Sequence, residues 1–252
     1  MSDRGVSDLI GYVLVFSLVA SSVAIVSIGG LDSLENARSV EQVNNAERAL
    51  DVLADNMEDL FREGAPSRAS EVTLEAASFQ TSDKVIINIS GNQTGGPNFS
   101  FQSQSNVLVW ESQGGRDTEL RYAFGTVIRN QRAGGVVLRE PPFEFGDERT
   151  ILPIVQTRTR NPQSLAGGKI RVRGVRLRSV VVWRGDASFD RLHLNVTTPA
   201  PDIWEEHLEV RDQVVDCERQ SVVDPEKTKV YCEFETDELY IIKQPVRVML
   251  ER

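Results

Sequence analysis

The chain has 252 residues, of which 37 are acidic and 28 are basic, so its formal net charge is −9 and its pI is about 4.9. An acidic chain is repelled by the phosphate backbone of nucleic acids, so the composition argues against a nucleic-acid partner. The length is sufficient for one large domain, or two small ones, beside a membrane anchor.

The first prominent stretch is Leu9–Leu31, 23 residues without a charged side chain. At about 1.5 Å of rise per residue, such a helix spans the roughly 30 Å hydrocarbon core of a bilayer. A secretory signal peptide has its small cleavage residue after a short apolar core. Here Arg4 and Gly5 both precede the apolar run. The order therefore predicts a membrane-spanning helix that stays on the chain.

This order resembles the class III signal peptide of type IV pilin-like proteins, in which a prepilin peptidase cuts after a small residue that follows a basic one. The resemblance implies a cut between Gly5 and Val6, a leader at 1–5 and a hydrophobic helix at 6–31. It implies other pilin-like subunits as partners in a filament. The fifth mature position, Glu in bacterial pilins, is Ile10, so Asp8 is the nearby acid for a neighbour's new amino terminus. The alternative is an uncleaved signal anchor.

The flanking charges predict the orientation of this helix. Arg4 precedes the span, while Asp32 and Glu35 follow it, so the positive-inside rule places the N-terminus in the cytoplasm and the rest of the chain outside the cell. Asn-X-Ser/Thr triplets agree with an exterior location, because they are acceptors for N-linked glycans. Such triplets also arise by chance. The four candidate glycosylation sites are Asn88, Asn92, Asn98 and Asn195.

The segment 32–65 is predicted to be an amphipathic helix. Its apolar residues are spaced by three or four and form one stripe, which either packs as core or binds a partner. Gly64 and Pro66 predict the helix end, since Gly accepts a left-handed cap and Pro cannot continue a helix. The stripe consists of Val43, Ala46, Leu50, Leu53, Met57 and Leu60.

Two stretches around this helix, Glu41–Met57 and Gly64–Glu71, resemble an uncharacterised haloarchaeal family. Its members open with Arg-Gly-Val-Ser, include Gly-Tyr-Val-Leu-Val-Phe, and join a pilin-like N-terminus to a β-rich exterior domain. The resemblance is specific over 4–71 and looser beyond. It implies placement at the cell surface without an activity. An acidic chain with only five lysines also resembles haloarchaeal proteins, whose charge repulsion is screened by molar salt.

Beyond residue 70 the pattern predicts many short strands and hardly any helix. We therefore expect an α+β chain in which the N-terminal helix is followed by a mainly antiparallel, β-sandwich-like exterior domain over 70–252. The expected strands are 71–79, 84–90, 106–111, 120–128, 135–139, 150–157, 169–173, 175–183, 191–197, 213–217, 229–235 and 239–250.

Four arginines in the strand region suggest a basic ridge for an anionic partner, such as the cell-surface layer. Arg171 and Arg173 alternate with apolar residues, as do Arg176 and Arg178, and Gly174 between them predicts a bulge or a turn. The alternative is a solvated strand face with local ion pairs.

Cys217 and Cys232 are placed symmetrically about Asp224-Pro225, so a hairpin that turns there brings them together. An exterior location permits a disulfide. The alternative is two separate reduced thiols.

The segment Asp202–Leu208 is predicted to be a short helix with Asp202 as its N-cap. Its Trp204 is interpreted as a plug at one end of the sheets, with carbohydrate stacking as the alternative.

No cofactor, metal-binding or hydrolase motif is evident, so we expect no enzyme. The preferred hypothesis is a minor or adhesive pilin-like protein that is anchored in the membrane and contacts other subunits, the cell-surface layer or glycans. The alternatives are a permanently anchored surface glycoprotein and an anchored exterior hydrolase that hides two carboxylates on separate strands.

Overall fold

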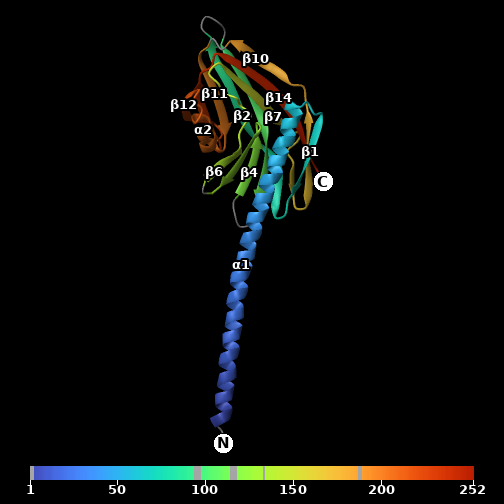
Figure 1. The fold of residues 1–252 in the computed structure, drawn as a ribbon, viewed down its shortest axis with the longest axis vertical. Coiled ribbons are helices and arrows are strands. Elements are labelled where there is room, and N and C mark those ends of the chain that lie inside the picture. Colours follow the sequence, from blue (N-terminus) through green and yellow to red (C-terminus); the bar gives the residue numbers. More distant parts are fainter. Residues whose placement is uncertain (1–2, 94–97, 114–117, 133, 187–188) are drawn as a thin grey trace. The chain divides into compact units, whose positions relative to one another are not determined.

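The computed structural model describes residues 3–93, 98–113, 118–132, 134–186 and 189–252, and the side chains of these except at 3–9, 28–32, 82, 83, 93 and 190. Helix α1 (Asp3–Arg62) comes first, and a mostly antiparallel β-rich domain follows it (Figure 1). The predicted α+β class is therefore confirmed. The chain divides into two compact units, Met1–Val43 and Asn44–Arg252.

In the first unit, the window Ile10–Ser27 is long and apolar enough to cross a membrane. Its mean hydropathy is 2.2 and none of it is buried. An exposed apolar surface of this length is costly in water, and its length and composition fit a membrane anchor or a signal sequence.

The second unit contains the end of α1, a short helix and two sheets. The five-stranded sheet has the order β1-β9-β14-β10, with β7 also paired to β14. Its strands are β1 (Ser67–Thr73), β7 (Arg149–Arg158), β9 (Lys169–Arg176), β10 (Val180–Asp186) and β14 (Glu238–Glu251). The β7–β14 pair is parallel, and the other pairs are antiparallel.

The larger sheet has nine strands in the order β12-β13-β11-β2-β3-β4-β5-β6, with β8 also paired to β2. Its strands are β2 (Ala77–Gln93), β3 (Phe99–Ser112), β4 (Thr118–Ala123), β5 (Thr126–Gln131), β6 (Gly134–Arg139), β8 (Ser164–Ala166), β11 (Phe189–Thr198), β12 (Val214–Ser221) and β13 (Thr228–Phe234). Helix α2 (Pro201–Glu209) lies beside β12 (Figure 1).

A large apolar core lies on the inner face of the nine-stranded sheet. Ile87 of β2, Leu194 of β11 and Val230 of β13 are fully buried there, together with Ile241 of β14 and Trp204 of α2. The alternation of buried and exposed residues along these strands explains why the sequence pattern identified them.

A second group of buried side chains gathers around the end of α1. Leu50, Leu53, Met57 and Leu60 are each at most 1% exposed, so the predicted apolar stripe packs as core. Gly174 of β9 lies so close to this helix that an added Cβ would be 2.9 Å from both Met57 Sδ and Leu60 Cδ1. The helix ends as predicted, because Gly64 has a left-handed φ of +74°.

The two sheets are also joined by polar groups between β3 and β7. Ser105 Oγ lies 2.8 Å from Thr157 Oγ1 and accepts a hydrogen bond from the Thr157 amide at 2.9 Å. The Gln156 side chain donates to the Gln104 carbonyl at 2.5 Å. These bonds satisfy buried polar groups where β3 of one sheet meets β7 of the other.

Two expected strands are each divided by a turn. The stretch 120–128 is a hairpin, because Phe124 (φ 53°) and Gly125 (φ 87°) form a tight turn between β4 and β5. The stretch 71–79 turns at Ala76 (φ 47°) between β1 and β2. Phe124 is fully buried, so the turn places an aromatic ring in the core at a position where a turn residue was not expected.

Two local expectations about loops and caps are wrong. The bulge or turn predicted at Gly174 is absent, since β9 keeps its register with β1 and β14 through this residue. Gly174 continues the buried face, and its missing side chain makes room for α1. Asp202 is not the N-cap of α2, because Pro201 begins the helix and Ala200 precedes it. Asp202 lies in the first turn, where its charge suits the helix dipole.

Candidate functional surfaces

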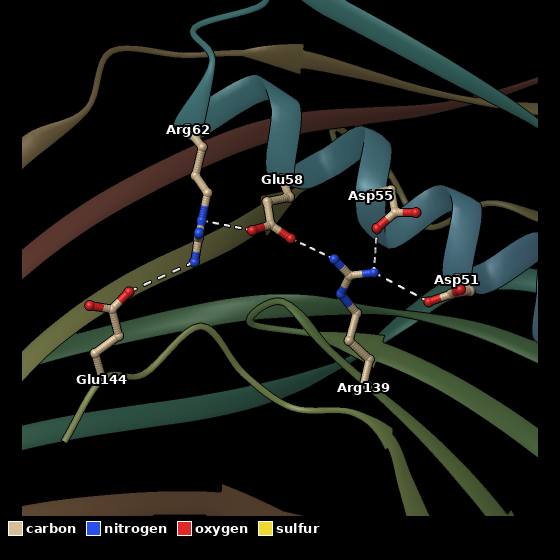
Figure 2. A network of polar contacts seen from close by, with 6 residues as sticks. All are labelled: Asp51, Asp55, Glu58, Arg62, Arg139 and Glu144. Atoms are coloured by element: carbon tan, nitrogen blue, oxygen red, sulfur yellow. Dashed lines mark hydrogen bonds and ion pairs between the residues drawn. The ribbon is translucent and has the colours of Figure 1, made fainter.

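A network of charged side chains fastens α1 to the nine-stranded sheet (Figure 2). Arg139, at the end of β6, contacts Asp51 at 3.2 Å, Asp55 at 2.6 Å and Glu58 at 2.5 Å. The helical spacing of these acids puts all three on one side of the helix. Partial burial opposes the charge of Arg139, but hydrogen bonds from its guanidinium to Asp55 and Glu58 outweigh this effect and raise its pKa.

The same segment of α1 is also bound to the five-stranded sheet. Asn56 donates to Ser70 Oγ of β1 at 2.9 Å, and Arg68 Nε contacts Asp59 at 2.9 Å. The helix therefore contacts strands of both sheets. Sequence reasoning did not identify this network, although the spacing of Asp51, Asp55 and Glu58 by four and three residues was a signal for a shared partner.

Helix α2 carries a buried histidine. His207 is 9% exposed, and its Nδ1 lies 3.9 Å from Glu140, which also accepts a 2.8 Å bond from Arg211. Burial lowers the pKa of His207, the Arg211 charge lowers it further, and Glu140 opposes both. Trp204 is 2% exposed and belongs to the apolar core, as the plug interpretation predicted. The helix therefore offers no ring for stacking on a sugar.

The hairpin β12–β13 contains a disulfide between Cys217 and Cys232. The two residues are direct partners in the strand register, and the turn at Asp224 lies midway between them. Lys227 and the Glu226 amide bond to the Asp224 carboxylate and lower its pKa. Cys232 is fully buried in the core, so the disulfide ties an exposed edge strand to the interior.

The sequon asparagines occupy two kinds of position. Asn92, near the end of β2, and Asn98, just before β3, are exposed. Asn88 and Asn195 lie within the sheet, where β2 pairs with β11, and Asn195 is only 8% exposed.

The four arginines are not gathered into one ridge. Arg171 and Arg173 share the exposed face of β9, where they lie 4.0 Å from Glu71 and 3.9 Å from Glu251. Arg176 belongs to the opposite face of the strand, because Gly174 does not change the phase, and its side chain lies beside Gly64. Arg178 follows the end of β9.

An open cleft of about 530 Å³ lies where β11, β12 and β13 meet neighbouring loops. Its lining contains five carboxylates and one arginine, so the cleft is strongly acidic. It is one concave site in which a hydrolase could hold an acid and a base. The charged lining residues are Asp147, Arg191, Asp212, Glu233, Glu235 and Asp237.

Among the residues that the structure describes, the carboxyl groups with shifted pKa values are shifted downward and lie outside this lining. Arg211 lowers the pKa of Glu140, and Arg149 lowers that of Glu238. A general acid requires the opposite shift. Within the described ranges no group of three or more His, Cys, Asp or Glu side chains is arranged to hold a metal ion.

Comparison with protein families gives one match, to a family of unknown function, DUF7289, over residues 4–249. The chain belongs to the DUF7289 family. The match includes both the N-terminal helix and the β-rich domain up to β14, so the two parts are characteristic of the family together. No curated protein and no solved structure matches the chain significantly.

In this DUF7289 chain the residues proposed for N-terminal processing are Gly5, Val6 and Asp8. Their backbone is helical, but they lie outside the residues whose side-chain surroundings the structure describes. Their roles therefore rest on the sequence pattern.

Proposed function

We propose that this DUF7289 protein is a pilin-like subunit of the haloarchaeal cell surface, either a minor pilin or an adhesive subunit. The observation that carries the proposal is the exposed apolar window Ile10–Ser27, which is preceded by Arg4-Gly5 and followed by a β-rich domain. In this proposal prepilin peptidase cuts between Gly5 and Val6, and the apolar helix remains on the mature chain.

The proposed mechanism is physical rather than catalytic. The apolar helix holds the subunit in the membrane through burial of its side chains in lipid. The same helix packs against other pilin-like helices when subunits assemble, and its small residues Gly11, Ser17 and Ala20 permit close approach. The β-rich domain then presents the outer surface to the cell-surface layer or to glycans.

A permanently anchored surface glycoprotein is the second candidate. It is favoured by Ile10 at the fifth mature position, where a bacterial pilin carries the glutamate that pairs with a neighbour's amino terminus. In this case the helix remains in the bilayer and the subunit never polymerises.

The deciding experiment is mass spectrometry of the N-terminal peptide from native membranes, with and without prepilin peptidase. We expect a peptide that begins at Val6 and that disappears when the peptidase is absent. A peptide that begins at Met1 or Ser2 in both preparations would exclude the pilin-like route and leave the permanent anchor as the function.

A further inference from the structure

Two of the four sequon asparagines face each other in the middle of the nine-stranded sheet. Asn88 of β2 is directly opposite Asn195 of β11, and Asn195 Nδ2 donates to Asn88 Oδ1 at 3.5 Å. Asn88 Nδ2 in turn donates to Ser100 Oγ of β3 at 3.4 Å. The two side-chain amides therefore belong to a polar chain that crosses three strands.

Asn195 is enclosed on both sides. Its other cross-strand neighbour is Tyr231 of β13, whose ring lies against the His193 imidazole with centroids 4.7 Å apart. Asn195 is 8% exposed, and its Oδ1 is buried without a hydrogen-bond partner in the described part of the chain. Facing side chains on adjacent strands are about 4.5–5.5 Å apart, so a sugar on the buried Asn195 amide would have to displace the side chain of Asn88 or Tyr231.

Asn92 and Asn98 are placed differently. Both are exposed, and both lie at the end of the sheet where β2 finishes and β3 begins. Asn92 pairs with Arg191, beyond the enclosed part of β11. A sugar attached to either amide extends into solvent without displacing a neighbouring strand.

We propose that N-linked glycans are attached at Asn92 and Asn98, and that Asn88 and Asn195 stay unmodified as a structural amide pair. This inference rests on the proposed exterior location, because the donor is a lipid-linked oligosaccharide at the outer membrane face. In the transfer, a bond forms between Asn Nδ2 and the anomeric carbon, the bond from that carbon to the lipid phosphate breaks, and the amide proton leaves to a base of the transferase.

The order of folding and transfer does not alter this outcome. If folding comes first, the enclosed Asn195 amide is out of reach of the transferase. If transfer comes first, a glycan on Asn195 disrupts the side-chain packing that encloses this residue between Asn88 and Tyr231, so the modified chain does not reach this folded state. The folded protein is therefore unmodified at Asn195 in either case.

The test is glycopeptide mass spectrometry of the folded full-length protein from native membranes. Residues 85–116 form one tryptic peptide with three sequons, so fragmentation must preserve the sugar–asparagine bond. We expect glycan on Asn92 and Asn98 and none on Asn88 or Asn195. The double variant Asn92→Gln/Asn98→Gln should lose all glycan mass, whereas the matched pair Asn88→Gln/Asn195→Gln should keep it. Bare Asn92 and Asn98, or glycan on Asn195, would overturn the inference.

Protease treatment of intact cells separates this inference from the proposed function. If the β-rich domain is digested from outside and Asn92 and Asn98 are bare, the exterior location stands and the glycosylation inference fails. If the domain is protected, the proposed exterior location itself fails, and the inference fails with it.

Discussion

Arg139 is the cation that allows three acids to lie side by side on α1. Asp51, Asp55 and Glu58 all reach its guanidinium, and Arg139 is only 24% exposed at its side chain. Hydrogen bonds to charged groups are stronger than neutral ones, and removal of one partner leaves the others uncompensated. Arg139 is therefore the shared cation of this contact between α1 and β6, and Glu58 also pairs with Arg62 at 2.7 Å.

We predict that Arg139→Met lowers the free energy of unfolding by about 2 kcal/mol, because three carboxylates lose their shared partner. The measurement is thermal or denaturant unfolding of the full-length protein in detergent. Arg184→Met is the control, since Arg184 is exposed on β10, and its effect should stay within about 0.5 kcal/mol. Equal stability of the two variants would show that the network contributes nothing.

His207 makes the stability of the folded domain depend on pH, and the direction of this dependence follows from its lowered pKa. Burial holds its folded-state pKa below the unfolded value of about 6.5, although Glu140 partly opposes the shift. The neutral form is therefore favoured by folding, and stability is lost as the pH falls from 7 through 6.5 toward the lower folded-state pKa. We predict that the melting temperature falls less between pH 7 and pH 5 in His207→Gln than in the wild type. An identical fall in both would contradict this assignment.

At the scale of elements, the hairpin β12–β13 forms one edge of the nine-stranded sheet, and a disulfide links its two strands. The cysteines are 15 residues apart in sequence, and Cys217 is opposite Cys232 in the register. Closing a loop of this length reduces the entropy of the unfolded chain, which stabilises the fold by about 3 kcal/mol in the chain-entropy model.

We predict that the double variant Cys217→Ser/Cys232→Ser unfolds at lower denaturant concentration, with a loss of about 3 kcal/mol. Reductant should destabilise the wild type and leave the double variant unchanged. A wild type that does not respond to reductant under unfolding conditions would argue that the thiols are not joined in the native protein.

The elements that could be predicted from sequence are those in which local pattern and tertiary contacts agree. The stripe of α1, the symmetric cysteines and the apolar side of α2 follow the helical and strand periods directly. The turn at Phe124-Gly125 could not be predicted, because Phe124 takes a left-handed conformation in order to bury its ring. Gly174 was misinterpreted for a related reason, since its role is set by Met57 and Leu60 of a distant helix.

The candidate surfaces were also predictable only in part, because the sequence shows the residues but not their positions in the sheets. The sequons were visible as triplets, but only strand register distinguishes the enclosed Asn195 from the exposed Asn92. The sequence shows that the arginines alternate with apolar residues. Only the continuous pairing of β9 shows that Arg176 lies on the face of the strand opposite Arg171 and Arg173. The partners of Arg139 are more than 80 residues away in sequence, so pattern alone could not join them.

At the scale of the whole molecule, the proposed location depends on the apolar window Ile10–Ser27 acting as a membrane anchor. We predict that Leu18→Asp/Val19→Asp releases the protein from carbonate-washed membranes, because an Asp at the centre of a span costs about 2.5–3.5 kcal/mol. Val223→Asp is the matched control, since Val223 is a fully exposed apolar residue in the second unit. Retention of the double variant in the membrane would exclude the window as the anchor.

The central place of β14 in the five-stranded sheet has a consequence for the timing of folding. Strand β14 follows the other described strands in sequence, yet it pairs with β7 on one side and with β9 and β10 on the other. Chains are made from the N-terminus, so β7, β9 and β10 emerge before the strand that unites them. During synthesis these strands remain without their common neighbour, and the domain becomes complete only when its last strand has been delivered.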